Sequence, residues 1–177
     1  MKNNELSYIP ETCIQNGTYI IENKIWNIKR NCFAELQSLE RIIIPENVKL
    51  IEDYAFANCR NLKEIQFLNK DCKLEFGIFK SCTSLENVKL PINIKTISIG
   101  CFSECINLKE IELPQSVSEI KDFTFYKCTS LREIYIPSAV AYISRNSFMG
   151  CKNLKKIHWR NKIYSYEDLV AYGKFED

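Results

Sequence analysis

The stretch from Cys105 to Cys128 reads CINLKEIELPQSVSEIKDFTFYKC, and it decides the fold because it recurs along the chain at a fixed interval. The interval is 23 residues, and it places cysteine at Cys59, Cys82, Cys105, Cys128 and Cys151. Leu36 holds the same position one interval earlier. A period of this size indicates a solenoid, in which each copy is too small to bury its own apolar face and stacks on its neighbours. The repeat indicates a binding scaffold without naming what is bound.

Outward from this stretch, the same register holds from residue 25 to residue 159. One position is always phenylalanine: Phe33, Phe56, Phe79, Phe102, Phe125 and Phe148. A second is always leucine: Leu39, Leu62, Leu85, Leu108, Leu131 and Leu154. A third lies in the first extended segment of each copy: Ile42, Ile65, Val88, Ile111, Ile134 and Ile157. A fourth lies on the return side: Ile28, Ile51, Leu74, Ile97, Ile120 and Ile143. These columns predict one continuous core.

Proline sets one corner of the repeat. The segment Leu-x-x-Ile-x-Leu reads as a short strand, and the proline that follows it ends the strand because proline cannot donate to a ladder. The Val-x-x-Ile segment predicts a second short strand on the opposite wall, and Phe-x-x-Cys predicts a single helical or 3-10 turn. In the copy between Cys59 and Cys82, Leu68 replaces proline and Asp71 replaces the expected valine. We expect a bulge or a register slip in that return strand.

Length and charge narrow the class of protein. The chain has 177 residues, of which 46% are hydrophobic, so we expect one domain over residues 1–177 with a sizeable core. A net charge of +2 is too balanced to indicate nucleic-acid binding. No segment approaches the ~20 apolar residues of a membrane span, and the N-terminus lacks the apolar run of a signal peptide. We expect a cytoplasmic monomer; the alternative is the cell surface or secretion, if a signal peptide was removed.

The two ends of the chain depart from the period. Residues 1–24 predict an N-terminal cap that contains a degenerate strand at Tyr19-Ile20-Ile21. Residues 160–177 predict a C-terminal cap with a short helix that begins after Ser165 and ends at Gly173. Asp168 stands three residues after Ser165, as in a reciprocal cap of a helix N-terminus.

The nine cysteines are predicted to be buried, free thiols. Side chains at one repeat position form a column with parallel Cα–Cβ vectors about 4.8 Å apart, whereas a disulfide needs Cβ atoms about 3.8 Å apart that face each other. Four ligands in a line also cannot surround a tetrahedral zinc ion. Free thiols suit a reducing compartment.

The pattern resembles the BspA-like class of leucine-rich repeat, whose signature runs Cys-x-x-Leu-x-x-Ile-x-Ile-Pro-x-x-Val-x-x-Ile-x-x-x-Ala-Phe-x-x-Cys. Residues 46–59, ENVKLIEDYAFANC, are among the best matches. The resemblance implies a leucine-rich repeat solenoid of the α/β horseshoe class, β-rich and right-handed, with short parallel strands on two walls. It also implies protein recognition, often on the surface of microbes or protists.

The residues do not assemble into a catalytic set. The single histidine, His158, stands between the core positions Ile157 and Trp159, so its side chain is expected to point away from the core. A Cys–His pair needs an exposed thiolate, and Cys151 belongs to the buried column. We therefore expect no enzyme, no cofactor and no metal.

The outward face of the first strand is the candidate binding surface. Its central position reads Ile43, Gln66, Lys89, Glu112, Tyr135 and His158. Tyr135 and His158, with Arg132 and Glu133 beside them, are the candidate anchor, because aromatic residues and arginine concentrate binding energy. The structural alternative is a solvated sheet face whose opposite charges pair across strands.

Two function classes follow from this surface. The first is a non-enzymatic scaffold that presents the outward strand face to another protein. The second is an adhesin-like surface or secreted fragment that binds host or matrix proteins or glycans.

Overall fold

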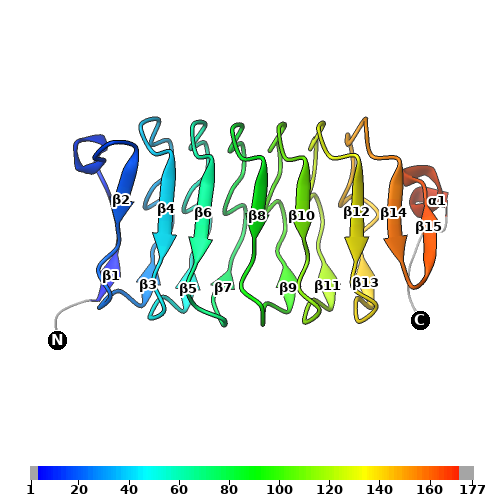
Figure 1. Ribbon diagram of the computed structural model, residues 1–177, viewed down its shortest axis with the longest axis horizontal. Helices are drawn as coiled ribbons and strands as arrows, with labels where there is room; N and C mark the ends of the chain where they lie inside the picture. The colour runs from blue at the N-terminus through cyan, green and yellow to red at the C-terminus, as the bar shows by residue number, and fades with distance from the viewer. Residues whose placement is uncertain (1–3, 172–177) are drawn as a thin grey trace.

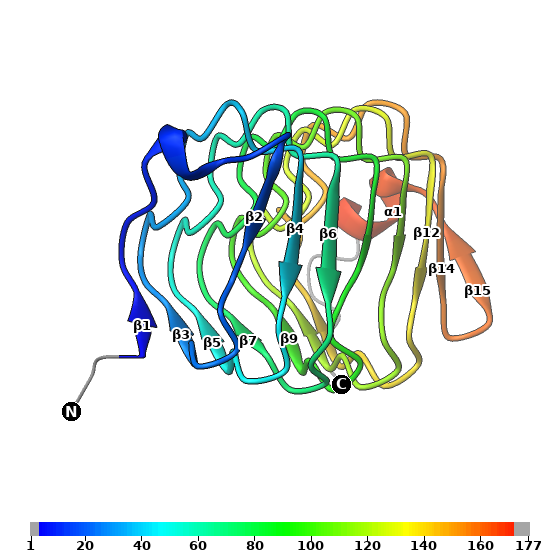
Figure 2. The ribbon, with the colours of Figure 1, turned by 60° about the vertical axis from the view of Figure 1, so that its left-hand side comes forward.

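The computed structural model describes residues 4–171, which wind into a solenoid whose coils stack side by side (Figure 1). The front wall consists of β2 (Thr18–Ile20), β4 (Arg41–Ile44), β6 (Glu64–Phe67), β8 (Asn87–Lys89), β10 (Glu110–Glu112), β12 (Glu133–Ile136) and β14 (Lys156–Trp159). The return wall, visible behind it in Figure 2, consists of β1 (Glu5–Leu6), β3 (Asn27–Ile28), β5 (Leu50–Ile51), β7 (Lys73–Leu74), β9 (Thr96–Ile97), β11 (Glu119–Ile120) and β13 (Tyr142–Ile143). The other elements are the 3-10 helix η1 (Glu11–Cys13), β15 (Lys162–Tyr164) and α1 (Tyr166–Ala171).

Neighbouring strands of each wall pair in parallel at the interval predicted from the sequence. Ile42 of β4 pairs with Ile65 of β6, which is one period away (65−42 = 23). β2 joins the front wall through Tyr19, which pairs with Ile42. The degenerate first strand is therefore confirmed. The return strand β1 was not foreseen; it pairs Leu6 with Ile28 at a spacing of one residue less (28−6 = 22).

The strand ladders are interrupted at three places among the described residues. No ladder pairing joins β6 to β8 or β10 to β12 on the front wall, or β7 to β9 on the return wall. The return-wall interruption lies at the irregular copy. Leu74 still pairs with Ile51 there, so the predicted register slip is not observed. Cys72 is buried next to the exposed Asp71. The irregular copy instead lacks the ladder between β7 and β9.

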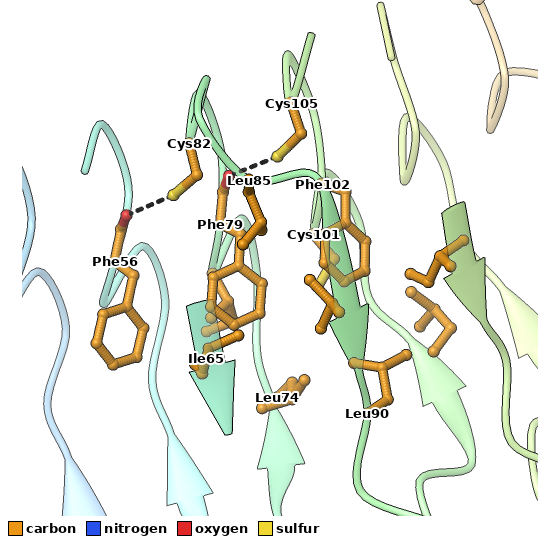
Figure 3. Packing of buried hydrophobic residues seen from close by; sticks show 14 of the residues in the cluster. Phe56, Ile65, Leu74, Phe79, Cys82, Leu85, Leu90, Cys101, Phe102 and Cys105 are labelled. Atoms are coloured by element: carbon orange, nitrogen blue, oxygen red, sulfur yellow. Dashed lines mark hydrogen bonds between the residues drawn. The ribbon is translucent and has the colours of Figure 1, made fainter. Parts of the chain in front are cut away.

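The core is built around the column of phenylalanines. Their side chains are between 0% and 1% exposed, and successive rings stack with centroids 4.9–5.8 Å apart. Figure 3 shows three of these rings in line, with leucine and isoleucine side chains of both walls beside them. At the N-terminal end, Tyr19 packs edge-on against Phe33, at 5.2 Å between centroids. The predicted core columns are thus confirmed.

The cysteine column ties each coil to the one before it. The thiol of Cys105 donates to the carbonyl oxygen of Phe79, with 3.0 Å between sulfur and oxygen, and the thiol of Cys82 donates to that of Phe56 at 3.1 Å (Figure 3). The same bond recurs at Cys59, Cys128 and Cys151, at 2.8–3.1 Å. Cysteine at this position therefore has two roles: its small side chain fits the core, and its thiol donates a hydrogen bond to the preceding coil.

Burial keeps these thiols protonated. All nine cysteines are free and eight of them are buried, including the five of the column, as predicted; Cys13 is exposed, which differs from the prediction. Desolvation raises the pKa of the Cys59 and Cys105 thiols to about 12. It also raises the pKa of Cys82 and Cys101 well above the ordinary range. Thiolates, which are the reactive form, are consequently scarce in the folded protein near neutral pH.

The turn that carries phenylalanine and cysteine alternates two kinds of hydrogen bond. The amide of Cys105 donates to Phe102 O within the turn, at 3.1 Å, as expected of a 3-10 bond. The amides of Phe102 and Glu104 donate instead to the next coil, to Thr124 O at 2.8 Å and Tyr126 O at 2.7 Å. This alternation is accompanied by two columns of residues in the left-handed region, neither of which was predicted. One column is Asn31, Tyr54, Gly77, Gly100 and Phe123, and the other is Glu35, Asn58, Ser81, Glu104, Lys127 and Gly150.

The C-terminal cap begins with a strand that was not predicted. β15 turns back through Arg160 and Asn161, both at positive φ (49° and 62°), and pairs antiparallel with β14. The helix α1 follows, and its N-terminus has the predicted cap: Asp168 N–H donates to Ser165 Oγ at 3.1 Å, and Ser165 N–H donates to Asp168 Oδ2 at 2.7 Å. The predicted stop at Gly173 lies outside the described residues.

Replacing one central phenylalanine is expected to destabilise the whole stack. Phe102→Ala leaves a cavity between the rings of two neighbouring coils, and should lower the free energy of unfolding by about 3–5 kcal/mol. The exposed control Lys89→Ala should change it by less than about 0.5 kcal/mol. Denaturant titration of both variants measures the difference. Equal losses would mean that the inward and outward sides have been assigned incorrectly.

The thiols are expected to react only when the protein unfolds. At pH 8, a thiol reagent should modify few groups in the folded chain, because the buried thiols stay protonated up to a pKa of about 12 at Cys59 and Cys105. In denaturant without reductant, nearly all nine should react. The exposed Cys13 is an internal control that should react first. A non-reducing mass map that finds two or more disulfides would contradict this assignment.

Candidate functional site

The front face is the outward side of the front wall, and it carries all eight candidate residues. Six of them occupy its central column, one on each strand from β4 to β14: Ile43, Gln66, Lys89, Glu112, Tyr135 and His158. Glu133 begins β12, and Arg132 directly precedes it. Seven of the eight are exposed, and His158 is half-buried. The alternation of inward and outward side chains along each strand places seven of them there, and Arg132 lies in the segment just before β12.

Tyr135 and His158 form a stacked pair. They are direct register partners on β12 and β14, and their ring centroids lie 4.1 Å apart with an angle of 11° between the planes. Tyr135 is 61% exposed. The side chain of His158 is 24% exposed, since the tyrosine ring lies on one side of it and β15 on the other. His158 Nε2 lies 3.4 Å from Glu133 Oε2. The sequence placed both rings on the same face, and the structure adds that they pack as one unit.

Another part of the front face behaves as a solvated sheet. Three exposed ion pairs join neighbouring coils: Lys63 Nζ with Glu40 Oε2 at 2.8 Å, Arg41 Nε with Glu64 Oε2 at 2.7 Å, and Lys109 Nζ with Glu86 Oε2 at 2.7 Å. Exposed pairs of this kind contribute little to stability, about 0–1 kcal/mol each. For these residues the structural alternative holds.

An open hollow of about 1150 Å³ lies over the C-terminal part of the front face. Residues of β10, β12, β14 and β15 line it, and the outward side chains among them include Glu110, Glu112, Glu133, Tyr135, His158 and Ile163. The hollow spans the interruption between β10 and β12. The structure therefore brings four of the predicted residues together in one place: Glu112, Glu133, Tyr135 and His158. Ile43, Gln66 and Lys89 lie on other strands, and Arg132 is not part of the lining.

Two exposed isoleucines of the front face were not identified from the sequence. Ile163 of β15 is 61% exposed and is the register partner of His158, so it extends the aromatic pair by one strand. Ile20 of β2 is 84% exposed and pairs with Ile43 at the opposite end of the wall. The signal for Ile163 was the alternation in Lys-Ile-Tyr after Asn161, which is short and easily missed.

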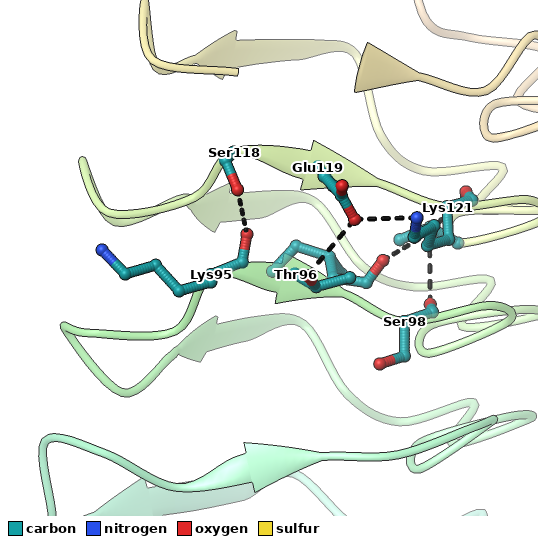
Figure 4. A network of polar contacts seen from close by, with 8 residues as sticks. Lys95, Thr96, Ser98, Ser118, Glu119 and Lys121 are labelled. Atoms are coloured by element: carbon teal, nitrogen blue, oxygen red, sulfur yellow. Dashed lines mark hydrogen bonds and ion pairs between the residues drawn. The ribbon is translucent and has the colours of Figure 1, made fainter. Parts of the chain in front are cut away.

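The return wall uses its polar side chains differently. In Figure 4, Glu119 lies between Thr96 and Lys121. Its carboxylate is 2.7 Å from Lys121 Nζ, and Thr96 Oγ1 donates to it at 3.5 Å. The ammonium group of Lys121 also lies 5.5 Å from the ring centroid of Tyr142. These groups are engaged with one another along the wall, whereas Glu110 and Glu112 in the front hollow form no ion pair within residues 4–171.

The hollow has the chemistry of a binding surface. It offers a planar aromatic pair, with carboxylates beside it and an aliphatic side chain at one edge. Within residues 4–171, no group of three or more His, Cys, Asp or Glu side chains is arranged to hold a metal ion. No helix in that range is long and apolar enough to cross a membrane.

Several solved structures share this architecture. A leucine-rich repeat protein of T. pallidum superposes with a TM-score of 0.80 at 24% identity, over 89% of this chain and 74% of that one. A leucine-rich cell surface protein of Faecalibacterium prausnitzii gives 0.71 at 29% identity, over 84% of this chain and 42% of that one. A leucine-rich repeat protein of Eubacterium ventriosum gives 0.73 at 21% identity, over 92% and 51%. This chain thus spans about half or less of the latter two. The comparison with curated proteins gave no match.

The family comparison covers nearly the whole chain. The family described as BspA type leucine rich repeat region matches residues 7–105 and 72–173, in six copies. Both the period and the residues at each repeat position agree with that family. The chain belongs to the BspA-type leucine-rich repeat family.

Proposed function

We propose that this protein is a non-enzymatic scaffold whose front face binds another protein. The observation that carries the proposal is the stacked pair of the exposed Tyr135 and the half-buried His158 in an open hollow. Neither ring fills the core, so their presence on the surface is not explained by the demands of folding. Exposed aromatic side chains in a depression are where binding energy concentrates in protein interfaces. Leucine-rich repeat proteins are commonly protein-binding or surface-associated, and the family is typically non-enzymatic.

We infer that the protein acts in the cytoplasm as a monomer, and that it binds neither nucleic acid nor membrane. The near-zero net charge of +2 supports the first of these exclusions. The free cysteines, including the exposed Cys13, support the cytoplasmic location, because free thiols suit a reducing compartment.

A second candidate is an adhesin-like fragment that is displayed on the cell surface or secreted, and that binds host or matrix proteins or glycans. The observation in its favour is the structural likeness to the Faecalibacterium prausnitzii protein that is described as a cell surface protein. The two candidates use the same face and differ in where the partner is found. Capture experiments with cytosolic extract and with cell-surface extract separate them: the scaffold should retain a partner from the first, and the adhesin from the second.

Changing both aromatic residues tests the binding face. In the double variant Tyr135→Ala/His158→Ala the fold should persist, since neither side chain points into the core. The captured partner should bind more weakly by more than about 1 kcal/mol if the pair is a hot spot. Isothermal titration with the purified partner measures the change.

The matched control changes three residues of the opposite wall, Lys95→Ala, Glu119→Ala and Tyr142→Ala. This triple variant should bind the partner with unchanged affinity. If it abolishes binding while the double variant does not, the return wall is the binding surface and the proposal is wrong.

A further inference from the structure

We propose that the hollow on the front face takes up an arginine side chain of the partner, between the ring of Tyr135 and the carboxylates of Glu110 and Glu112. This inference rests on the function proposed above and specifies the chemistry of the bound group. Three observations support it: the exposed face of the tyrosine ring, the carboxylates that form no ion pair, and the missing ladder between β10 and β12.

One side of the Tyr135 ring is available to a ligand. His158, on β14, covers the other side at 4.1 Å between centroids. In the stack, β12 lies between β10 and β14 (Figure 1). Because His158 covers the ring from the side of β14, the other side of the ring is turned toward β10. No other aromatic ring or cation of the described residues stacks on it, and the residue is 61% exposed. A planar guanidinium group stacks well on such a ring.

The carboxylates next to this ring lack close cationic partners. Glu110 and Glu112, both on β10, form no ion pair within residues 4–171, and Glu133 contacts only the imidazole of His158, at 3.4 Å. Three other glutamates of the front face do form ion pairs with cations of neighbouring coils: Glu40, Glu64 and Glu86. Arg160 and Lys162 also line the hollow, but among the described residues no ion pair joins either of them to Glu110, Glu112 or Glu133. A cationic group therefore complements the charges of Glu110 and Glu112 beside Tyr135.

Two lysines stand opposite these carboxylates and could compete for them. Lys89 is the register partner of Glu112, and Lys156 is that of Glu133. Neither forms an ion pair with its opposite residue in the structure, and an exposed lysine–carboxylate pair is weak in any case. A guanidinium donates two parallel hydrogen bonds to a carboxylate and stacks on a ring at the same time, which an ammonium group cannot do. The arrangement therefore favours arginine over lysine.

The missing ladder provides the position for the side chain. Strands joined by a ladder lie about 4.8 Å apart and leave no room for another group between their side chains. β10 and β12 are not joined in this way, and the hollow opens over both of them. A side chain that enters there meets Glu110 and Glu112 on one flank and Tyr135 on the other.

The test is an NMR titration of the full chain with blocked pentapeptides of the sequence Gly-Ser-X-Ser-Gly. X is arginine, lysine or citrulline, which has the planar shape of arginine without its charge. The arginine peptide should shift the backbone amides of β10, β12 and β14, and should bind at least fivefold more tightly than the citrulline peptide. Glu112→Gln and Glu110→Gln should each weaken the binding of the arginine peptide about threefold or more. Lys89→Ala removes the competing lysine and should strengthen the binding of the arginine peptide.

The matched control is Glu64→Gln, on the same face and in the same column as Glu110, two periods away (110−64 = 46). It should change the affinity by less than twofold. Equal binding of citrulline, equal effects of Glu64→Gln and Glu110→Gln, or lysine bound as tightly as arginine would each overturn the proposal. If the partner loses affinity on the Tyr135→Ala/His158→Ala change but not on Glu110→Gln or Glu112→Gln, the face is correct and arginine is wrong. Loss only in the return-wall variant would refute the binding face itself.

Discussion

The contact between the phenylalanine ring of one coil and that of the next is the interaction on which the rest of the structure depends. No single coil encloses a core, so each ring is buried only because a neighbour covers it on either side. The thiol of the next cysteine fixes the same neighbours through a hydrogen bond to the phenylalanine carbonyl oxygen, 3.0 Å long at Cys105. Rings and thiols act at the same interval of 23 residues, so a coil out of register would lose both at once.

This stacking also determines what the front face can do. Because the inward positions are occupied by the core columns, every second side chain of a front strand is free to vary from coil to coil. In two coil-to-coil steps, from β4 to β6 and from β8 to β10, the outward positions hold salt-bridged charges, which contribute little to stability. At β12 and β14 they hold two aromatic rings that stack across neighbouring coils, with carboxylates beside them. The solenoid thus turns a repeated backbone into a surface that differs along its length.

The fold was largely predictable from the sequence, because a column of identical residues at one interval leaves few other architectures. The core phenylalanines, the free thiols and the cap at Ser165 were all expected before the structure. The strands β1 and β15 were not, since each is two or three residues long and lies outside the period. Both left-handed columns were also missed: one contains Glu35 and Lys127 as well as Gly150, and the other contains Phe123 as well as Gly77, so residue type does not reveal them.

The candidate site was predictable only in part. Alternation along the strands placed Tyr135 and His158 on the outward face, and the period made them neighbours. Their close stacking, the hollow and the interrupted ladder between β10 and β12 depend on small displacements of whole strands. No single residue type signals such a displacement, which is why Lys89 and Glu112 could not be told apart as candidates.

The measurement that tests the central claim most directly compares two internal deletions in denaturant unfolding. Deletion of residues 83–105 removes one full period of 23 residues and joins Cys82 to Ile106, which leaves every column in register. Deletion of residues 83–104 removes one residue fewer and displaces the columns at the junction. We expect the first variant to unfold in one cooperative transition, with a free energy of unfolding lower by the contribution of one coil. The second variant should unfold at a clearly lower denaturant concentration than the first. Equal stability of the two variants would contradict the central claim.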